Sequence, residues 1–359
     1  MMLSTLNNAG CAQQPVASFA FDWQELPALP DKVGFAGSFG GVSNRALLVA
    51  GGANFPDGGA PWTGSTKVWY DRIFVLENRS GQWQEAEKLP RPLGYGVSVS
   101  WRGNLIVVGG SNVSGHFADV FMLQYKDGKI TTEPLPALPK PNANACGALV
   151  GNIIYIAGGL EKPDAKTTES SFWALDLTKP SDERQWEILP TWPGSSRMLS
   201  VAGAKDGSFY LFSGTQLVAG KREYLKDAYK YTPGNGWTKI ADVPEPMVAA
   251  PSPAYVTGDN LIVFGGDDGK YAATAATLKE RHPGFSKNIW QYNTQTNTWA
   301  NAGNIYTQTK NDAATNPNGS IWAPVTTPLV TWQNNVVLPG GEVRPATRTP
   351  RILVAIPEK

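Results

Sequence analysis

The sequence predicts an all-β protein built from one repeated unit. Six apolar stretches end in a glycine pair or in its variant Ser213-Gly214, roughly 50 residues apart along the chain. A segment rich in turn-forming residues precedes each stretch, and another strand-like segment follows it after a loop. The 38 glycines and 28 prolines suit many short strands joined by tight turns, and long helical periodicities are few.

Each unit opens with a β-hairpin. Its second strand is the apolar stretch that reaches the glycine pair: ALLVAGG to Gly52, LIVVGG to Gly110, IIYIAGG to Gly159, FYLFSG to Gly214, LIVFGG to Gly266 and VVLPGG to Gly341. The preceding turns, VSNR, WRGN, VGN, KDG, TGDN and WQNN, hold the Gly, Asn and Asp residues that tight turns need for positive φ. We expect glycine at the pair because the inner strands crowd toward a common axis, where a side chain would obstruct the neighbouring backbone.

Two more strands complete each unit. The third strand of the first five units is DRIFVLE, ADVFMLQY, SFWALDL, DAYKY or KNIWQY. The fourth strand carries a tryptophan in four of them, namely Trp83, Trp186, Trp237 and Trp299, whereas the second unit has KITTEPLPALP at that place. We expect these tryptophans to pack between neighbouring units rather than to bind a ligand.

The sixth unit is completed from the other end of the chain. Its third strand is RILVAIP, residues 351–357, and no fourth strand follows it in the sequence. The segment FDWQELPALP near the N-terminus repeats the pattern of the fourth strand QWQEAEKLP, with Trp23 in the tryptophan position. The N-terminal strand is therefore predicted to complete the last sheet and to close a ring.

Six four-stranded units with a paired glycine and a later tryptophan resemble kelch repeats, which build a β-propeller. The prediction is thus a single six-bladed kelch-type β-propeller over residues 19–359. Residues 1–18 are expected to be an N-terminal extension, in which Ala9-Gly10-Cys11 is compatible with the remnant of a signal or lipoprotein segment.

Composition narrows the classes of function. The net charge of +1 gives no bias toward nucleic acid or an anionic membrane. No apolar run approaches the roughly 18 residues of a membrane span. Cys11 and Cys146 are too few for a disulfide framework, and His116 and His282 are too few for a multi-histidine metal site. We expect a small-molecule ligand and no cofactor, and the sequence does not indicate an oligomeric state.

Candidate ligand-binding residues follow the glycine pairs. In a propeller, the loops at one mouth of the central channel bring together residues that are far apart in the sequence. Polar residues dominate these positions: Asn54, Asn112, Gln216, Asp267 and Glu342. Such donors and acceptors suit a hydroxyl-rich ligand such as a sugar, although each residue taken singly can equally be a solvated turn residue.

Two long loops, residues 53–70 and 267–287, follow the first and the fifth glycine pairs. Long ordered loops on a rigid scaffold are often functional. Because the ring closes, blade six lies between blades five and one, so both loops flank Glu342. Their aromatic and basic residues are candidates to roof a cleft over that blade: Trp62, Trp69, Tyr271, Lys279, Arg281 and His282.

The run LPGGEVRPATRTPRI places Glu342 directly after the last glycine pair and follows it with Arg344, Arg348 and Arg351. Partial burial at a channel mouth raises the pKa of a carboxylate toward the range useful for proton transfer. Nearby arginines act oppositely, and they also offer a planar fork to a substrate carboxylate, for which we prefer Arg348. The alternative is a surface cluster of exposed ion pairs, which contribute little stability.

The stretch GGEVRPATRT resembles the glutamate motif of the bacterial N-acetylneuraminate epimerases, or sialic acid mutarotases, which are six-bladed kelch propellers of similar length. GFAGSFGGVSNRALLVAGGANF and RPLGYGVSVSWRGNLIVVGG are also similar to that family. In the family, a glutamate after a glycine is the proton acceptor and an arginine follows six residues later, a spacing that Glu342 and Arg348 keep. The glutamate blade is central in better known members and last here, so the resemblance implies a circularly permuted member. Gly340 also stands where some members carry a polar side chain.

The resemblance implies an epimerase that interconverts the α and β anomers of N-acetylneuraminate by opening and closing the sugar ring. Glu342 would be the base, and Arg348, assisted by Arg344, would hold the carboxylate. Hydroxyl or N-acetyl groups would contact Asn54, Asn112 and Gln216. A periplasmic or cell-envelope location is implied as well. Two alternatives remain: a kelch module that binds carbohydrate or protein without catalysis, and a sialidase-like hydrolase, whose Ser-x-Asp-x-Gly-x-Thr-Trp turns are missing from the sequence.

Overall fold

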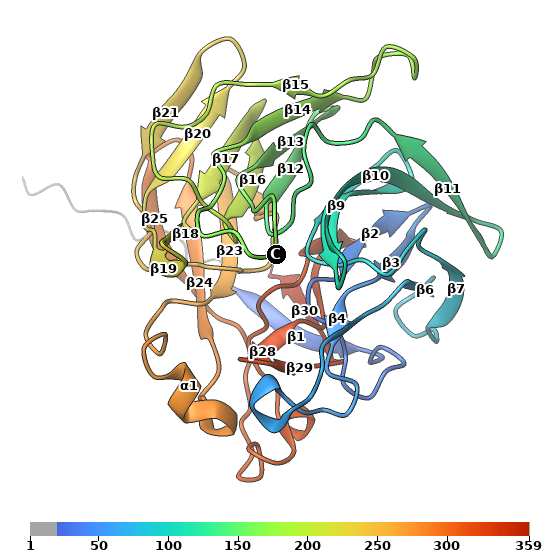
Figure 1. Cartoon of the computed structure of the whole chain (residues 1–359), viewed down its shortest axis with the longest axis vertical. Coiled ribbons are helices and arrows are strands. Elements are labelled where there is room, and N and C mark those ends of the chain that lie inside the picture. The colour runs from blue at the N-terminus through green and yellow to red at the C-terminus, as the bar shows by residue number, and fades with distance from the viewer. Residues whose placement is uncertain (1–19, 359) are drawn as a thin grey trace, which may run out of the picture.

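The structure is a computed structural model that describes residues 20–358. Six four-stranded antiparallel sheets are arranged as blades around a common axis (Figure 1). The first strands of neighbouring blades contact one another and therefore line that axis. The predicted six-bladed all-β propeller is thus confirmed, and the proposed extension at residues 1–18 lies outside the described residues.

Blades 1 to 3 follow the chain in order. Blade 1 consists of β2 (Phe39–Ser43), β3 (Ala46–Ala50), β6 (Arg72–Leu76) and β7 (Gln84–Lys88). Blade 2 consists of β8 (Val97–Trp101), β9 (Asn104–Asn112), β10 (Gly115–Lys126) and β11 (Lys129–Leu135). Blade 3 consists of β12 (Cys146–Val150), β13 (Ile153–Ala157), β14 (Phe172–Asp176) and β15 (Glu187–Ile188).

Blades 4 to 6 repeat the pattern. Blade 4 consists of β16 (Val201–Lys205), β17 (Ser208–Phe212), β20 (Ala228–Thr232) and β21 (Gly236–Ile240). Blade 5 consists of β22 (Tyr255–Thr257), β23 (Asn260–Gly266), β24 (Ser286–Asn293) and β25 (Thr298–Asn304). Blade 6 consists of β26 (Val330–Trp332), β27 (Asn335–Pro339), β30 (Ile352–Pro357) and β1 (Phe21–Leu26).

The loops after the glycine pairs carry small elements of their own. Two-stranded ribbons are formed by β4 (Ala53–Asn54) with β5 (Val68–Trp69), β18 (Thr215–Val218) with β19 (Lys221–Tyr224), and β28 (Glu342–Arg344) with β29 (Thr347–Arg348). A short helix, α1 (Ala275–Leu278), interrupts the long loop of blade 5. Within residues 20–358, no helix is long and apolar enough to span a bilayer.

The chain ends close the ring as predicted. Strand β1 pairs antiparallel with β30, from Phe21 opposite Pro357 to Leu26 opposite Ile352. At the end of this ladder, Arg351 Nη1 donates to both carboxylate oxygens of Glu25, at 3.0 and 2.7 Å. Blade 6 therefore consists of strands from both ends of the described chain.

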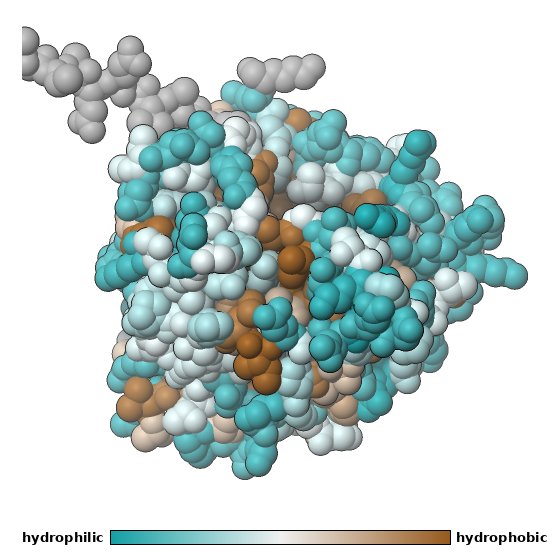
Figure 2. All heavy atoms as spheres, turned by 90° about the horizontal axis from the view of Figure 1, so that it is seen from above, coloured by the Kyte–Doolittle hydropathy of each residue, from teal (hydrophilic) through white to brown (hydrophobic). Residues whose placement is uncertain are grey.

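The hydrophobic core is divided into clusters that lie between adjacent blades. Between blades 1 and 2, for example, Phe39 and Leu48 pack with Leu105 and Phe121. Burying one such side chain stabilises the fold by about 1.5–3 kcal/mol. The four tryptophans predicted to pack between units each donate their indole N–H to a carbonyl at the end of the preceding blade: Trp83 to Pro27, Trp186 to Pro136, Trp237 to Pro190 and Trp299 to Ala241. On the face shown in Figure 2, hydrophilic and intermediate residues dominate, and hydrophobic residues gather mainly near the centre.

Glycine is required in these pairs for a different steric reason from the one expected. They end the second strand of a blade and not the innermost one, and both residues of a pair such as Gly51 and Gly52 have positive φ. A Cβ on Gly51 would lie 2.3 Å from the carbonyl oxygen of Leu93, and one on Gly158 would lie 2.2 Å from that of Arg197. Both carbonyls belong to the loop leading into the next blade. The crowding is therefore between blades, where the chain crosses the end of the strand, and not at the axis.

A closed ring of backbone hydrogen bonds, which we call the axial ring, surrounds the axis. One residue from each blade donates its N–H to the carbonyl of its counterpart in the preceding blade, at 2.7 or 2.8 Å. The six residues are Gly37, Tyr95, Asn144, Leu199, Ala249 and Thr326, and all have φ between 52° and 67°. Five of them carry side chains in a backbone region that favours glycine, which the surrounding structure must enforce.

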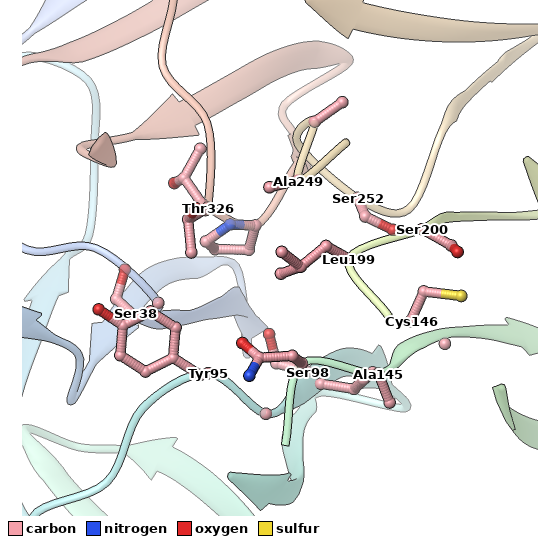
Figure 3. Close-up of a pocket in the computed structure, with 18 residues that line it drawn as sticks. Ser38, Tyr95, Ser98, Ala145, Cys146, Leu199, Ser200, Ala249, Ser252 and Thr326 are labelled. Atoms are coloured by element: carbon pink, nitrogen blue, oxygen red, sulfur yellow. The ribbon is translucent and has the colours of Figure 1, made fainter. Parts of the chain in front are cut away.

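A small cavity of about 90 Å³ lies along the axis beside the axial ring (Figure 3). Hydroxyl groups of Ser38, Ser98, Ser200 and Ser252 line it together with Cys146. Burial raises the pKa of the Cys146 thiol to about 12, so this cysteine is inert at neutral pH.

Candidate active site

A large cavity of about 1160 Å³ lies at one mouth of the propeller channel. It shares five lining residues with the small axial cavity, and all five belong to the axial ring: Tyr95, Asn144, Leu199, Ala249 and Thr326. The axial ring is therefore the floor between the two cavities. The walls come from the loops after the glycine pairs, including the β28–β29 ribbon and the segment with α1 near the bottom of Figure 1.

Glu342 opens the β28–β29 ribbon and lines the large cavity. Its backbone is fixed by a pair of hydrogen bonds with Val325, at 2.8 and 2.9 Å. Its side chain is 21% exposed, and Oε1 accepts the N–H of Ala346 at 2.7 Å. Oε2 has no hydrogen-bond partner in the described part of the chain. One carboxylate oxygen is thus anchored while the other is free to accept a proton.

Arg348 lies opposite Glu342 in the same ribbon and is 4% exposed. Its Nη1 is 3.7 Å from Glu342 Oε1, its Nη2 is 3.4 Å from the hydroxyl of Tyr95, and its guanidinium stacks 4.8 Å from the ring centroid of Phe55. Its Nε and Nη1 are buried without a hydrogen-bond partner. Burial alone would lower the pKa of Arg348, but Glu342 and Tyr95 outweigh it and hold the pKa above its ordinary value. A permanent cation with two buried, unpartnered nitrogen donors therefore lies at the wall of the cavity.

The structure does not place Arg344 on the wall of the cavity. Its side chain is buried under the loops, where Nη1 donates to the carbonyls of Glu280 and Ala313 and the guanidinium lies 5.3 Å from the ring centroid of Trp322. Burial lowers the pKa of Arg344 below its ordinary value. In a regular strand, residues two positions apart point to the same side. The register of β28 shifts between Glu342 and Arg344, however, so the two side chains have different surroundings.

Asn54 and Gln216 do not line the cavity either. Asn54 is 1% exposed, donates to the carbonyl of Gly34 at 2.9 Å and accepts the hydroxyl of Tyr70 at 2.9 Å. Gln216 donates to the carboxylate of Glu223 across the β18–β19 ribbon at 2.6 Å. Both amides are occupied by the loops that they stabilise.

Asn112 and Asp267 do line the cavity, although protein groups already occupy them. Asn112 donates to the carbonyl of Pro92 at 2.9 Å and accepts the N–H of Ser114 at 2.8 Å. Asp267 accepts the hydroxyl of Tyr224 at 2.6 Å, and burial together with this carboxylate raises the pKa of Tyr224. Any ligand contact they make uses their remaining lone pairs or N–H groups.

Both long loops reach the cavity. Residues 53–70 contribute Phe55, Pro61, Lys67 and Trp69, and residues 267–287 contribute Asp267, Tyr271, Ala272, Ala273, Ala275, His282 and Phe285. The loops also contact each other, since the indole N–H of Trp62 donates to Glu280 at 2.5 Å. Lys279 and Arg281 lie on the second loop but not on the cavity wall.

His282 is 5% exposed and packs against the rings of Tyr271 and Phe285. Its Nδ1 accepts the N–H of Gly284 at 3.1 Å, so the hydrogen of the neutral ring is on Nε2. Burial lowers the pKa of His282 below its ordinary value. The ring is therefore a neutral donor at pH 7.

Sequence reasoning missed the residues of the floor. Tyr95, Asn144 and Leu199 share no residue type, because the ring that places them is made of backbone groups. A positional signal does exist: in blades 1 to 4 the ring residue stands two positions before the first strand. Once the strands are assigned, that offset identifies which side chains meet at the axis.

Comparisons with known proteins agree with this architecture and add a family. N-acetylneuraminate epimerase from Haemophilus influenzae (strain 86-028NP) is 29% identical over 236 residues, which are 60% of this chain and 57% of the relative. The enzyme of the same name from Yersinia pestis (strain Pestoides F) is 34% identical over 143 residues, 36% of each chain. That from Salmonella arizonae is 38% identical over 121 residues, 30% of this chain and 31% of the relative. The chain thus spans somewhat more than half the length of the first of these curated relatives and about a third of the others.

The solved structure of YjhT superposes with a TM-score of 0.63 and 17% identity, covering 90% of this chain and 94% of that one. At this identity the likeness shows the fold alone. The sequence model of the N-acetylneuraminate epimerase family matches residues 3–132 and 135–355. With nearly the whole length matched, the chain belongs to the N-acetylneuraminate epimerase family.

Proposed function

We propose that this protein interconverts the α and β anomers of N-acetylneuraminate by opening and closing the sugar ring. The observation that carries the proposal is the pair Glu342 and Arg348, which face one cavity with Nη1 and Oε1 3.7 Å apart. The pair combines a carboxylate that has a free oxygen with a buried guanidinium that has unused N–H donors.

The geometry suits this substrate because its carboxylate is attached to the anomeric carbon itself. A carboxylate bound at Arg348 brings the anomeric hydroxyl, on the same carbon, toward Glu342. The anomeric carbon bears no hydrogen, so the anomers cannot exchange by loss of a proton from carbon. Ring opening is then the required route, and it needs a base at the hydroxyl rather than at carbon.

In the proposed step, Glu342 Oε2 takes the proton of the anomeric hydroxyl. The electron pair of that O–H bond forms the keto carbonyl while the bond from the anomeric carbon to the ring oxygen breaks, and the ring oxygen takes up a proton from solvent water. Rotation about the bond between the anomeric carbon and the ring carbon beside it presents the other face of the carbonyl. Closure by the reverse transfers gives the other anomer, with no change in oxidation state.

The size of the cavity supports a reaction with an open-chain intermediate. Its volume of about 1160 Å³ exceeds the usual range for small-ligand pockets, roughly 300–1,000 Å³. The extra room accommodates the rotation of the opened chain without release. Backbone hydrogen bonds between Glu342 and Val325, beside the axial-ring residue Thr326, hold the base in place meanwhile.

The test is proton NMR of freshly dissolved N-acetylneuraminate with purified protein. Catalysis predicts that the two anomers reach equilibrium faster than in buffer and in proportion to protein concentration. Anomer exchange at the buffer rate would contradict the proposal and would favour the alternative, a kelch module that binds its ligand without catalysis. Release of free sugar from an α-sialoside in a parallel sample would instead indicate a hydrolase.

A further inference from the structure

We propose that Lys67 is a second cation for the carboxylate of the substrate and that Tyr95 joins it to Arg348. The inference rests on the proposed function, because it names the group that recognises the acid of the same sugar. Neither Lys67 nor Tyr95 was among the residues to which the sequence pointed. The geometry around each carries the argument.

Lys67 is held in place by two aromatic rings. It lies in the long loop just before β5, is half-buried and lines the large cavity. Its Nζ is 4.8 Å from the ring centroid of Trp69 and 4.7 Å from that of Tyr95. Cation–π contacts on two sides fix an ammonium group whose stem is otherwise flexible. The loop thus positions the charge instead of leaving it in solvent.

Tyr95 connects the two cations. Its hydroxyl oxygen is 3.4 Å from Lys67 Nζ and 3.4 Å from Arg348 Nη2. Because both neighbours are donors, the oxygen acts as acceptor and the phenol hydrogen is directed elsewhere, with no acceptor among residues 20–358. Tyr95 also belongs to the axial ring, so its backbone is fixed from both sides.

The two positive charges beside Tyr95, on Lys67 and Arg348, are faced by only one carboxylate among the described residues. Lys67 forms no salt bridge in the described chain, and Arg348 has only Glu342, at the long distance of 3.7 Å. Arg348 is more than nine-tenths buried and keeps Nε and Nη1 without partners, an independent sign that an acceptor belongs here. Two cations joined by one phenol on the wall of one cavity fit an anion, and a carboxylate offers enough lone pairs for all three groups.

The kinetic consequence follows from the place of the carboxylate in the reaction. The group stays on the reacting carbon and keeps its charge through ring opening and closure. A contact to it is equally strong in the ground state and in the transition state, so losing it raises KM and leaves kcat nearly unchanged. Loss of the base Glu342 should instead lower kcat and leave KM nearly unchanged.

The experiment measures binding by calorimetry of N-acetylneuraminate and of its methyl ester, which has the same ring without the charge. Lys67→Met keeps most of the apolar stem, and we expect it to weaken binding of the acid about 10–100-fold, as for a lost charge-assisted hydrogen bond. Binding of the ester should change less than about threefold. Lys67→Arg should restore most of the affinity for the acid.

Lys221→Met is the matched control, since this lysine lies exposed at the cavity without an aromatic sandwich. We expect it to change binding of the acid less than about threefold, as for an exposed charge. Equal losses for acid and ester in Lys67→Met, or no loss for the acid, would overturn the inference. Binding needs no turnover, so wild type that binds the acid but does not speed anomer exchange would refute the proposed function alone. Wild type that does not bind the acid would refute both.

Discussion

Glu342 and Arg348 lie directly opposite each other in the short β28–β29 ribbon, with Arg348 Nη1 3.7 Å from Glu342 Oε1. The separation is too long for a good hydrogen bond, and Glu342 Oε1 instead accepts the backbone N–H of Ala346. Each group therefore keeps capacity for a third partner. A tight bidentate ion pair would have used the hydrogen-bonding capacity of both residues and left few donors or acceptors for a ligand.

Replacing Arg348 tests its part in binding. We expect Arg348→Met to weaken binding of N-acetylneuraminate at least 30-fold, because the buried donors that face the carboxylate are gone. Arg348→Lys keeps the charge but not the planar fork and should lie in between. Calorimetric titration of each folded variant gives the comparison. Wild-type affinity in Arg348→Met would remove this residue from the site.

Arg344 should behave as a structural residue. Arg344→Met leaves the carbonyls of Glu280 and Ala313 without their donor, and we expect the free energy of unfolding to fall by roughly 2–4 kcal/mol. Arg344→Lys reaches fewer acceptors and should lose part of that. Chemical denaturation monitored by tryptophan fluorescence measures both. An unchanged free energy of unfolding, combined with a large loss of substrate affinity, would show that Arg344 binds the substrate and is not a structural residue.

Stability should decline on mild acidification because of the two histidines. Burial lowers the pKa of His116 and of His282 below the ordinary 6.5. The unfolded chain then binds more protons than the folded chain as the pH falls through 6.5, so the free energy of unfolding decreases until the folded-state pKa values are passed. Urea denaturation at pH 7.5 and 5.5 should show the decrease in wild type and less of it in His116→Gln/His282→Gln. An equal decrease in both proteins would assign the effect to other groups.

Ring closure should depend on packing more than on charge. Trp23 of β1 lies against Phe264 of blade 5 with ring centroids 6.1 Å apart, whereas Glu25 and Arg351 form a partly exposed ion pair. We expect Trp23→Ala to lower the free energy of unfolding by about 2–4 kcal/mol and Glu25→Ala by less than about 1 kcal/mol. Thermal and denaturant unfolding compare the two variants. A larger effect of Glu25→Ala would mean that the ion pair holds the ring together.

Most of the fold was predictable because it follows from periodic features. A glycine pair or its variant and a set of turn residues recur in every unit, and a tryptophan recurs in all but the second, so weak signals support one another. The pattern of FDWQEL indicated the closing strand. The reason for the glycines was not predictable, since contact between Gly51 and the carbonyl of Leu93 depends on how blades stack. The circularly permuted blade order stays a prediction, because none of the alignments tests the order.

The site was only partly predictable. Glu342 and Arg348 stood out because they combine charge with a position after a strand end, and the structure brings them together. Asn54 had the same positional signal, but nothing in the sequence says which of two successive residues turns toward the axis. Tyr95 and Lys67 were missed because one is placed by a backbone ring and the other by aromatic contacts within a long loop.

The most direct test of the account is anomer exchange of N-acetylneuraminate by Glu342→Gln, measured by proton NMR beside wild type. The amide keeps the shape of the side chain but cannot accept the proton, and we expect the rate to fall at least about 100-fold. Calorimetric affinity for the sugar should stay within about threefold of wild type. Exchange by Glu342→Gln as fast as by wild type would show that another group is the base and would contradict the account.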